Sequence, residues 1–183
     1  MVLARRKSGG GCVYQDLGNS VFSFINPITD FATQDFKKLN NEVLLNALRE
    51  LGVEGKASGR NDLEIDGKKV SGSAYKLKLG TKDGSNKRSL HHGTMLLDLE
   101  LNALSKYLNP NKKKLESKGV ASVISRVMNL KEAIPEISHA SWNQALERAF
   151  SAKWADMPVH KTVLREKDLR EVPLLMDIYE KSA

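Results

Sequence analysis

The sequence predicts an α+β fold, with a mixed, largely antiparallel sheet flanked by helices. The spacing of apolar residues changes along the chain from a period of two to a period near 3.6 and back. An Asp-Gly pair at residues 66–67 separates two strand-like runs, which is typical of a tight hairpin. The resulting order is strand, helix, hairpin, strand, helix, strand, helix.

The first two elements follow from periodicity. Residues 20–26 alternate polar and apolar side chains, which predicts a strand that ends at Pro27. A short strand fragment, Cys-Val-Tyr, is predicted before it, at residues 12–14. A helix follows, for which Thr33 is the expected N-cap and Gly52 the expected stop. Its predicted apolar face comprises Phe36, Leu39, Val43, Leu44, Ala47, Leu48 and Leu51.

The later elements are predicted in the same way. After the hairpin come a strand over 91–101, a short helix over 102–109 and a β-rich run over 122–130. Ser138 or Ser141 is expected to cap a further helix. The apolar face of that helix comprises Trp142, Ala145, Leu146, Ala149 and Phe150.

Composition restricts the function classes. The 183 residues carry a net charge of +7, which favours an anionic partner. The single cysteine, Cys12, rules out an internal disulfide and a cysteine-rich zinc site, and it fits a reducing compartment. Apolar runs are too short to cross a bilayer. The basic stretch 112–118 lacks an aromatic stacking platform, so nucleic-acid binding has only the net charge in its favour.

A basic, glycine-rich segment near the start of the chain could bind an anion. Glycines 9–11 allow backbone amides to approach a phosphate or carboxylate closely, and Arg6 supplies a permanently charged donor fork. The segment lacks the Lys-Ser/Thr of a Walker loop and the spacing of a Rossmann fingerprint. From these residues alone, a flexible connector is an equally good interpretation.

Other candidates are ambiguous by themselves. Asn61-Asp62 could form a simple turn, or could bind a nucleotide and its metal. By count alone Lys69 is one solvated lysine among many, but Gly72 inside a strand often marks close approach of a ligand. His91 and His92 are adjacent on a strand and point to opposite faces, so they are not a metal motif.

Four motifs, occurring in order, carry a resemblance to a known family. They resemble the lipoate–protein ligases of the lipoate/biotin ligase superfamily, over roughly residues 3–135. The motifs are RRKSGGGCVYQDLGN, GRNDLEIDGKKVSGSAYKL, HHGTMLLDLELNALSKYLNP and KKKLESKGVASVISRVMNL.

The resemblance implies an enzyme with two half-reactions. The carboxylate of lipoate attacks the α-phosphate of ATP to give lipoyl-AMP, and a lysine of a lipoyl domain then takes the lipoyl group as an amide. The lysine before Val-Ser-Gly-Ser, here Lys69, would be catalytic, because a fixed cation stabilises charge shared by carboxylate and phosphate. The implied acceptors are E2 subunits of 2-oxo acid dehydrogenases and the glycine-cleavage H protein.

The resemblance also implies the remaining site residues. The residues expected to bind ATP and lipoyl-AMP are Arg6, Gly11, Cys12, Val13, Tyr14, Asn61, Asp62 and Lys69, with Asp62 near Mg²⁺. The residues expected to line the lipoate pocket are Gly10, Ser71, Gly72 and His92. We expect a monomer that binds neither nucleic acid nor membrane.

Departures from the family pattern leave alternatives open. Relatives start well before the arginine-glycine motif, and many carry an accessory C-terminal domain. We therefore expect residues 1–157 to be a catalytic domain without its usual N-terminal portion, and 158–183 to begin a missing accessory segment. The alternatives are a lipoyltransferase using lipoyl-AMP or a lipoylated protein donor, and a non-catalytic binding fragment. With no leader visible, we expect a mitochondrial protein in a eukaryote and a cytoplasmic one in a bacterium.

Overall fold

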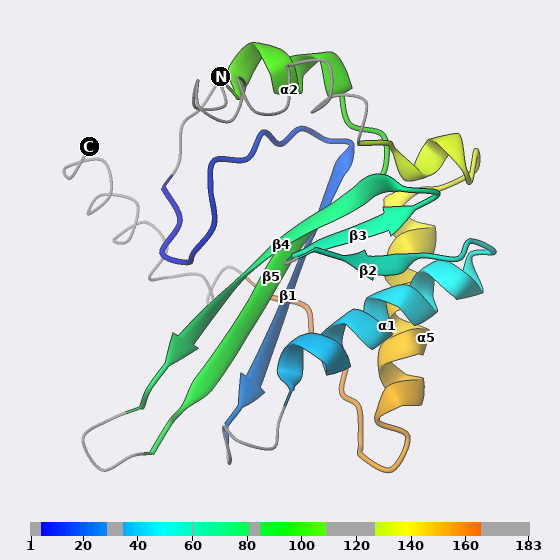
Figure 1. The fold of residues 1–183 in the computed structure, drawn as a ribbon. Coiled ribbons are helices and arrows are strands. Elements are labelled where there is room, and N and C mark those ends of the chain that lie inside the picture. The colour runs from blue at the N-terminus through cyan, green and yellow to red at the C-terminus, as the bar shows by residue number, and fades with distance from the viewer. Residues whose placement is uncertain (1–4, 29–34, 60, 81–84, 109–126, 166–183) are drawn as a thin grey trace. The chain divides into compact units, whose positions relative to one another are not determined.

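The computed structural model describes residues 5–28, 35–59, 61–80, 85–108 and 127–165 (Figure 1). The chain divides into two compact units. One unit comprises residues 8–153 and contains every helix and strand of the described chain. The other comprises residues 1–7 and 154–183, of which 5–7 and 154–165 are described. The predicted boundary at residue 157 stays a prediction.

The larger unit is built on a five-stranded antiparallel sheet in the order β1-β5-β4-β3-β2. Its strands are β1 (Asn19–Pro27), β2 (Lys56–Ser58), β3 (Asp62–Ile65), β4 (Lys68–Lys78) and β5 (Arg88–Leu96). β3 and β4 form the predicted hairpin, in which Asp66 and Gly67 have φ of 50° and 76°. Both residues of the turn therefore adopt the left-handed conformation that an Asp-Gly turn favours.

Two long helices pack against each other. They are α1 (Phe36–Glu50) and α5 (His139–Lys153), and ion pairs join Glu50 to Arg148 and Glu42 to Lys153 across them. Their buried side chains include Leu44, Leu48 and Trp142, each at most 1% exposed. Two shorter helices, α2 (Leu101–Tyr107) and the 3₁₀ helix η1 (Leu130–Glu132), follow the sheet.

The two faces of the sheet differ in what they carry. Cross-strand partners share a face and neighbours along a strand alternate. We call the side with Asp62, Lys69, Gly72, Ala74 and His92 the lysine face, and the side with Phe22, Phe24, Ser71, Tyr75 and His91 the histidine face. Helix α1 lies over the histidine face, because Lys37 is 6.0 Å from the Tyr75 ring centre and Asn40 donates to Asn26.

The fold class and most elements are confirmed. The predicted strand over 20–26, the helix ending at Gly52 and the short helix after residue 101 are all present. Ser138 caps α5, since its Oγ accepts a hydrogen bond from the amide of Ser141. The expected cap Thr33 lies outside the described residues, and Asp35 caps α1 by accepting from the Lys38 amide.

Four local expectations are wrong. Residues 12–14 form no strand, because no other strand pairs with them. The strand predicted over 91–101 ends at Leu96, and the described end of the β-rich run, residues 127–130, forms a single bridge at Val127 and begins a 3₁₀ turn at Leu130 rather than a strand. Phe150 is 37% exposed and so stands apart from the buried face of α5. The expected remainder of the β-rich run, 122–126, lies outside the described residues.

Candidate active site

A β-bulge places Lys69 on the lysine face. Opposite β3, Lys69 pairs with Glu64 and Ser71 pairs with Leu63, so Val70 is an extra residue between them. Val70 and Ser71 are consecutive and both at most 1% exposed, which strict alternation would not allow. The bulge therefore turns Lys69 to the same side as Gly72 instead of the same side as Ser71.

Lys69, Asp62 and Gly72 form the centre of the candidate site. The Lys69 ammonium lies 2.8 Å from the Asp62 carboxylate, and both side chains are more than a third exposed. A Cβ on Gly72 would stand 2.9 Å from Lys69 Nζ and 3.8 Å from Asp62 Oδ1. Glycine at position 72 thus leaves the room that the ammonium occupies, and the charge stays accessible to a ligand.

Asn61, the residue before Asp62, is held by strand β4, which also carries Lys69 and Gly72. The carbonyl of Asn61 accepts hydrogen bonds from the amide and the hydroxyl of Ser73, at 2.9 and 3.0 Å. Asn61 is half-buried beside the position where Gly72 pairs with Asp62. Asn61 and Asp62, which the sequence left as a turn or a ligand-binding pair, are therefore brought to the lysine.

The end of the fourth motif lies beside Lys69. Val127 forms a parallel bridge with Lys69, and the amide of Met128 donates to the Lys69 carbonyl at 2.9 Å. Residues 127–129 therefore run beside the catalytic candidate, although they form no regular strand. Sequence reasoning placed the fourth motif in the family pattern but missed this contact.

The segment that contains Gly9, Gly10 and Gly11, called here the glycine segment, begins beside β4. A Cβ on Gly9 would lie 3.2 Å from the carbonyl oxygen of Tyr75, and Gly10 has a φ of 98°, which only glycine adopts freely. Around Gly11 a Cβ would meet nothing within 4 Å. The segment is thus close to the sheet at its start and open at its third glycine.

The end of the same segment is fixed by aromatic and polar contacts. The Tyr14 ring stacks on Tyr107 of α2 with centroids 5.5 Å apart, and its carbonyl accepts from Asn19. Desolvation, followed by the nearby Asp16 carboxylate, raises the pKa of Tyr14, so the phenol keeps its proton. The intervening Cys12 is a free, exposed thiol and Val13 is 51% exposed.

The two histidines separate as adjacent strand residues should. His92 pairs with Ala74 and lies on the lysine face, partly exposed. His91 is fully buried on the histidine face, stacked 4.1 Å from the Tyr75 ring. Burial, followed by the positive influence of His92 and Lys37, lowers the pKa of His91 to about 4, so this ring is neutral near pH 7.

One expected site residue turns its side chain away from the lysine, and another belongs to the other compact unit. The Ser71 side chain shares the histidine face with Leu63 and Met95 and is 1% exposed. Arg6 is exposed and belongs to the smaller unit. Among the described residues, no group of three or more His, Cys, Asp or Glu side chains could hold a metal ion, and no helix is long and apolar enough to span a membrane.

Solved structures that are similar to this chain include lipoate protein ligases. A ligase from Thermoplasma acidophilum, described as bi-partite and studied with its E2 lipoyl domain, has 29% identity and a TM-score of 0.76 over 96% of this chain and 66% of that one. LipL1 of P. falciparum, solved with lipoate, has 32% identity and a TM-score of 0.70 over 96% of this chain and 47% of that one.

A lipoate-protein ligase A solved with ATP has 26% identity and a TM-score of 0.76, over 96% of this chain and 67% of that chain. The present chain thus spans between 47% and 67% of the length of these three relatives. The sequence model of the family described as "Lipoyl protein ligase A/B catalytic domain" matches residues 1–151. This chain therefore belongs to the lipoyl protein ligase A/B catalytic-domain family.

Proposed function

We propose that this protein is an ATP-dependent lipoate–protein ligase, and that the Lys69 ammonium is its principal catalytic group. The observation that carries the proposal is the accessible Lys69–Asp62 pair, which the bulge and Gly72 place on the lysine face. Structures of similar ligases with bound lipoate and with bound ATP support the same substrates for this chain.

The first half-reaction joins two anions. A carboxylate oxygen of lipoate attacks the α-phosphorus of ATP, the bond to the β-phosphate oxygen breaks, and pyrophosphate leaves. The Lys69 ammonium, released from Asp62, would lie between carboxylate and α-phosphate and stabilise the charge that they share in the transition state. Holding both reactants at one cation also supplies orientation.

The second half-reaction transfers the lipoyl group. The amine of an acceptor lysine attacks the carbonyl carbon of lipoyl-AMP, an amide bond forms, and AMP leaves with the electron pair of the anhydride oxygen. We propose lipoyl domains of E2 subunits and the H protein as acceptors. The E2 lipoyl domain studied with the archaeal ligase supports this choice.

The glycine segment would hold the adenylate. Backbone amides near Gly10 and Gly11 can approach phosphate oxygens, because neither position carries a side chain and Gly10 adopts a positive φ. Arg6 would add a bidentate charge to the same phosphates. Cys12 and Val13 would contribute through their backbone, and Tyr14 through its stack on Tyr107.

The lipoyl group would lie along the lysine face. Gly72 has no side chain and Ala74 a small one, so they leave room for a ligand above this part of the sheet. His92, on the neighbouring strand β5, pairs with Ala74. Ser71 can reach this surface only through its backbone, since its side chain lies on the other face. Gly10 would close the pocket from the glycine segment.

Asp62 suits a magnesium ion that is bound mainly by ATP. Mg²⁺ usually takes one or two carboxylates together with phosphate oxygens, so a single aspartate is a sufficient protein ligand. Asp62 would hold the ion once Lys69 turns from it to the substrates. When bound, the ion neutralises phosphate charge and so favours the departure of pyrophosphate.

The proposal is tested by lipoylation of a purified lipoyl domain, with lipoate, ATP and Mg²⁺ in one reaction and preformed lipoyl-AMP in another. We expect product in both. Product only in the reaction with lipoyl-AMP would mean that the protein is a lipoyltransferase and not a ligase. Product in neither would support the non-catalytic alternative.

A further inference from the structure

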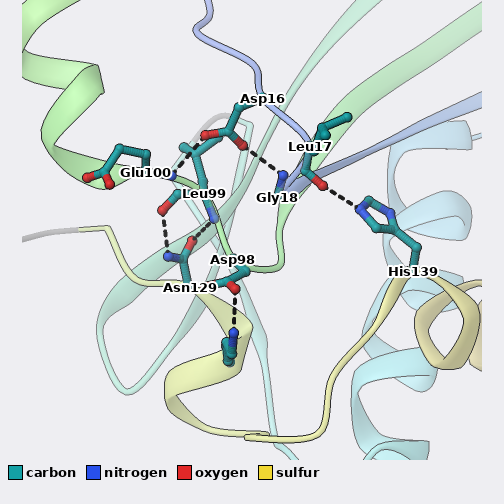
Figure 2. Close-up of polar contacts among 9 residues, drawn as sticks. Asp16, Leu17, Gly18, Asp98, Leu99, Glu100, Asn129 and His139 are labelled. Atoms are coloured by element: carbon teal, nitrogen blue, oxygen red, sulfur yellow. Dashed lines mark hydrogen bonds and ion pairs between the residues drawn. The ribbon is translucent and has the colours of Figure 1, made fainter.

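The glycine segment leaves the candidate site through a polar junction (Figure 2). The Asp16 carboxylate accepts the amide of Gly18 through Oδ1 at 2.8 Å and the amide of Glu100 through Oδ2 at 3.0 Å. The same carboxylate lies near the Tyr14 phenol and helps to raise its pKa. Asp16 therefore ties three points together: its own segment, the start of β1 and the turn between β5 and α2.

The turn between β5 and α2 is also hydrogen-bonded to residue Asn129, which lies close to Lys69 in the fold. The side-chain amide of Asn129 accepts from the Leu99 amide at 3.0 Å and donates to the Leu99 carbonyl at 2.8 Å. Asn129 is 9% exposed and follows Met128, whose amide bonds to the Lys69 carbonyl. Hydrogen bonds, linked by the peptide bonds of residues 128–129 and 99–100, thus lead from Lys69 through Asn129 to Asp16.

The junction has little room to adjust. A Cβ on Gly18 would stand 2.0 Å from the carbonyl oxygen of Asp98, and the amides of Leu97 and Asp98 both donate to the Gly18 carbonyl. At the first residue of α5, His139 Nε2 lies 2.8 Å from the Leu17 carbonyl. Figure 2 shows this contact. The exit of the segment is therefore fixed on several sides, and Asp16 is the charged group at its centre.

We propose that Asp16 is a positioning residue for the ligase reaction: it sets the glycine segment at a fixed place relative to Lys69 without touching substrate. The inference rests on the proposed function. Both carboxylate oxygens accept backbone amides, which aspartate can do and asparagine cannot, because the asparagine NH₂ would face an N–H donor. Loss of one anchor would let the phosphate-binding amides move relative to the lysine.

The test compares Asp16→Asn and Asp16→Ala with Asp98→Asn. Asp98 lies in the same turn, but its carboxylate pairs with Lys131 at the surface, so it is a matched control. Lipoate-dependent ATP–pyrophosphate exchange gives KM for ATP and kcat per folded molecule. Amide hydrogen exchange at Gly18 and Glu100 reports the junction without depending on activity.

For both Asp16 variants we expect KM for ATP to rise about tenfold, and amide exchange at Gly18 or Glu100 to accelerate about tenfold, with the sheet amides unchanged. Asp98→Asn should match the wild type. A variant that only unfolds more easily would instead lose total activity at constant KM and constant kcat per folded molecule, and this result would overturn the proposal. So would an unchanged KM with unchanged amide exchange.

The two proposals fail differently. Wild-type protein without pyrophosphate exchange would overturn the proposed ligase function, and the positioning role in that reaction with it. Wild-type activity together with Asp16 variants of normal KM would overturn the positioning role alone.

Discussion

The two faces of β4 use the same backbone for different purposes. On the histidine face, Ser71 and Tyr75 lie with His91 beneath α1, and burial raises the pKa of Tyr75 to about 12 and lowers that of His91 to about 4. On the lysine face, Lys69 and Gly72 lie beside Asp62, and the charged pair stays more than a third exposed. Groups on the first face are kept neutral, while the Lys69–Asp62 ion pair on the second face is accessible.

Because of this difference, substitutions on the two faces of β4 should affect different properties of the protein. Side chains on the histidine face fill space between the sheet and α1, so their substitution should alter the free energy of unfolding. The Lys69–Asp62 pair is a partly exposed ion pair, a kind that contributes roughly 0–1 kcal/mol. Substitutions on the lysine face should therefore alter activity first.

The largest effect is expected for Lys69→Ala. Removing the cation that would bridge carboxylate and α-phosphate should lower pyrophosphate exchange by at least about a hundredfold. The midpoint of urea unfolding should stay close to that of the wild type, because an exposed pair is lost. A variant that retains most of its exchange activity would remove Lys69 from the mechanism.

A pair of glycine substitutions tests the two faces directly. In Gly93→Ala the Cβ would stand 2.5 Å from the Phe22 ring and 2.6 Å from the Gly72 carbonyl oxygen, so we expect about 1–3 kcal/mol of destabilisation. In Gly72→Ala the nearest atoms are the flexible end of Lys69, which can move. We expect near-normal stability and a loss of activity of about tenfold or more.

Urea unfolding and pyrophosphate exchange should be measured on both glycine variants. A Gly72→Ala protein that is as unstable as Gly93→Ala, or fully active, would show that the lysine face does not have the separate role proposed here.

The buried histidine should make stability depend on pH. Folding lowers the pKa of His91 from 6.5 to about 4, so the unfolded chain binds more protons between these values. Stability should therefore fall as pH drops from about 6.5 to 4, by at most about 3 kcal/mol. Because neither ring nitrogen has a hydrogen-bond partner in the described part of the chain, His91→Phe should fit and flatten this dependence.

Urea unfolding at pH 4.5 and 7.5 measures this effect. If wild-type protein and His91→Phe lose the same stability between the two pH values, other groups must account for the acid sensitivity.

The smallest effect is expected for Lys68→Ala. Lys68 precedes Lys69 in β4, but its ammonium lies 3.9 Å from Glu132 at the surface, with both side chains about half exposed. We expect stability within about 0.5 kcal/mol of the wild type and unchanged pyrophosphate exchange. A strong loss of activity would mean that general positive charge, rather than the placement of Lys69, carries the function.

Elements with a strong local signal were predictable from the sequence. The alternation in β1, the period of α1 and the Asp66-Gly67 turn each depend on residues close together in the chain, and all three are confirmed. The segment 12–14 looked like a strand, but strand formation needs a neighbour, and residues 12–14 have none in the sheet. Local propensity could not supply that information.

The details of the candidate site depend on distant pairing. Alternation alone would have grouped Lys69 with Ser71, and only the register against Leu63 and Glu64 shows the bulge that separates them. The anchoring by Asp16 joins residues 84 positions apart, so the sequence offered only a weak signal, an aspartate two residues before Gly18 that is typical of an Asx turn.

The measurement that tests the central claim most directly is lipoate-dependent ATP–pyrophosphate exchange by wild-type protein, Lys68→Ala and Lys69→Ala. The account predicts equal exchange by the wild type and Lys68→Ala, and loss of at least about a hundredfold in Lys69→Ala at unchanged stability. Equal exchange by all three proteins would contradict it.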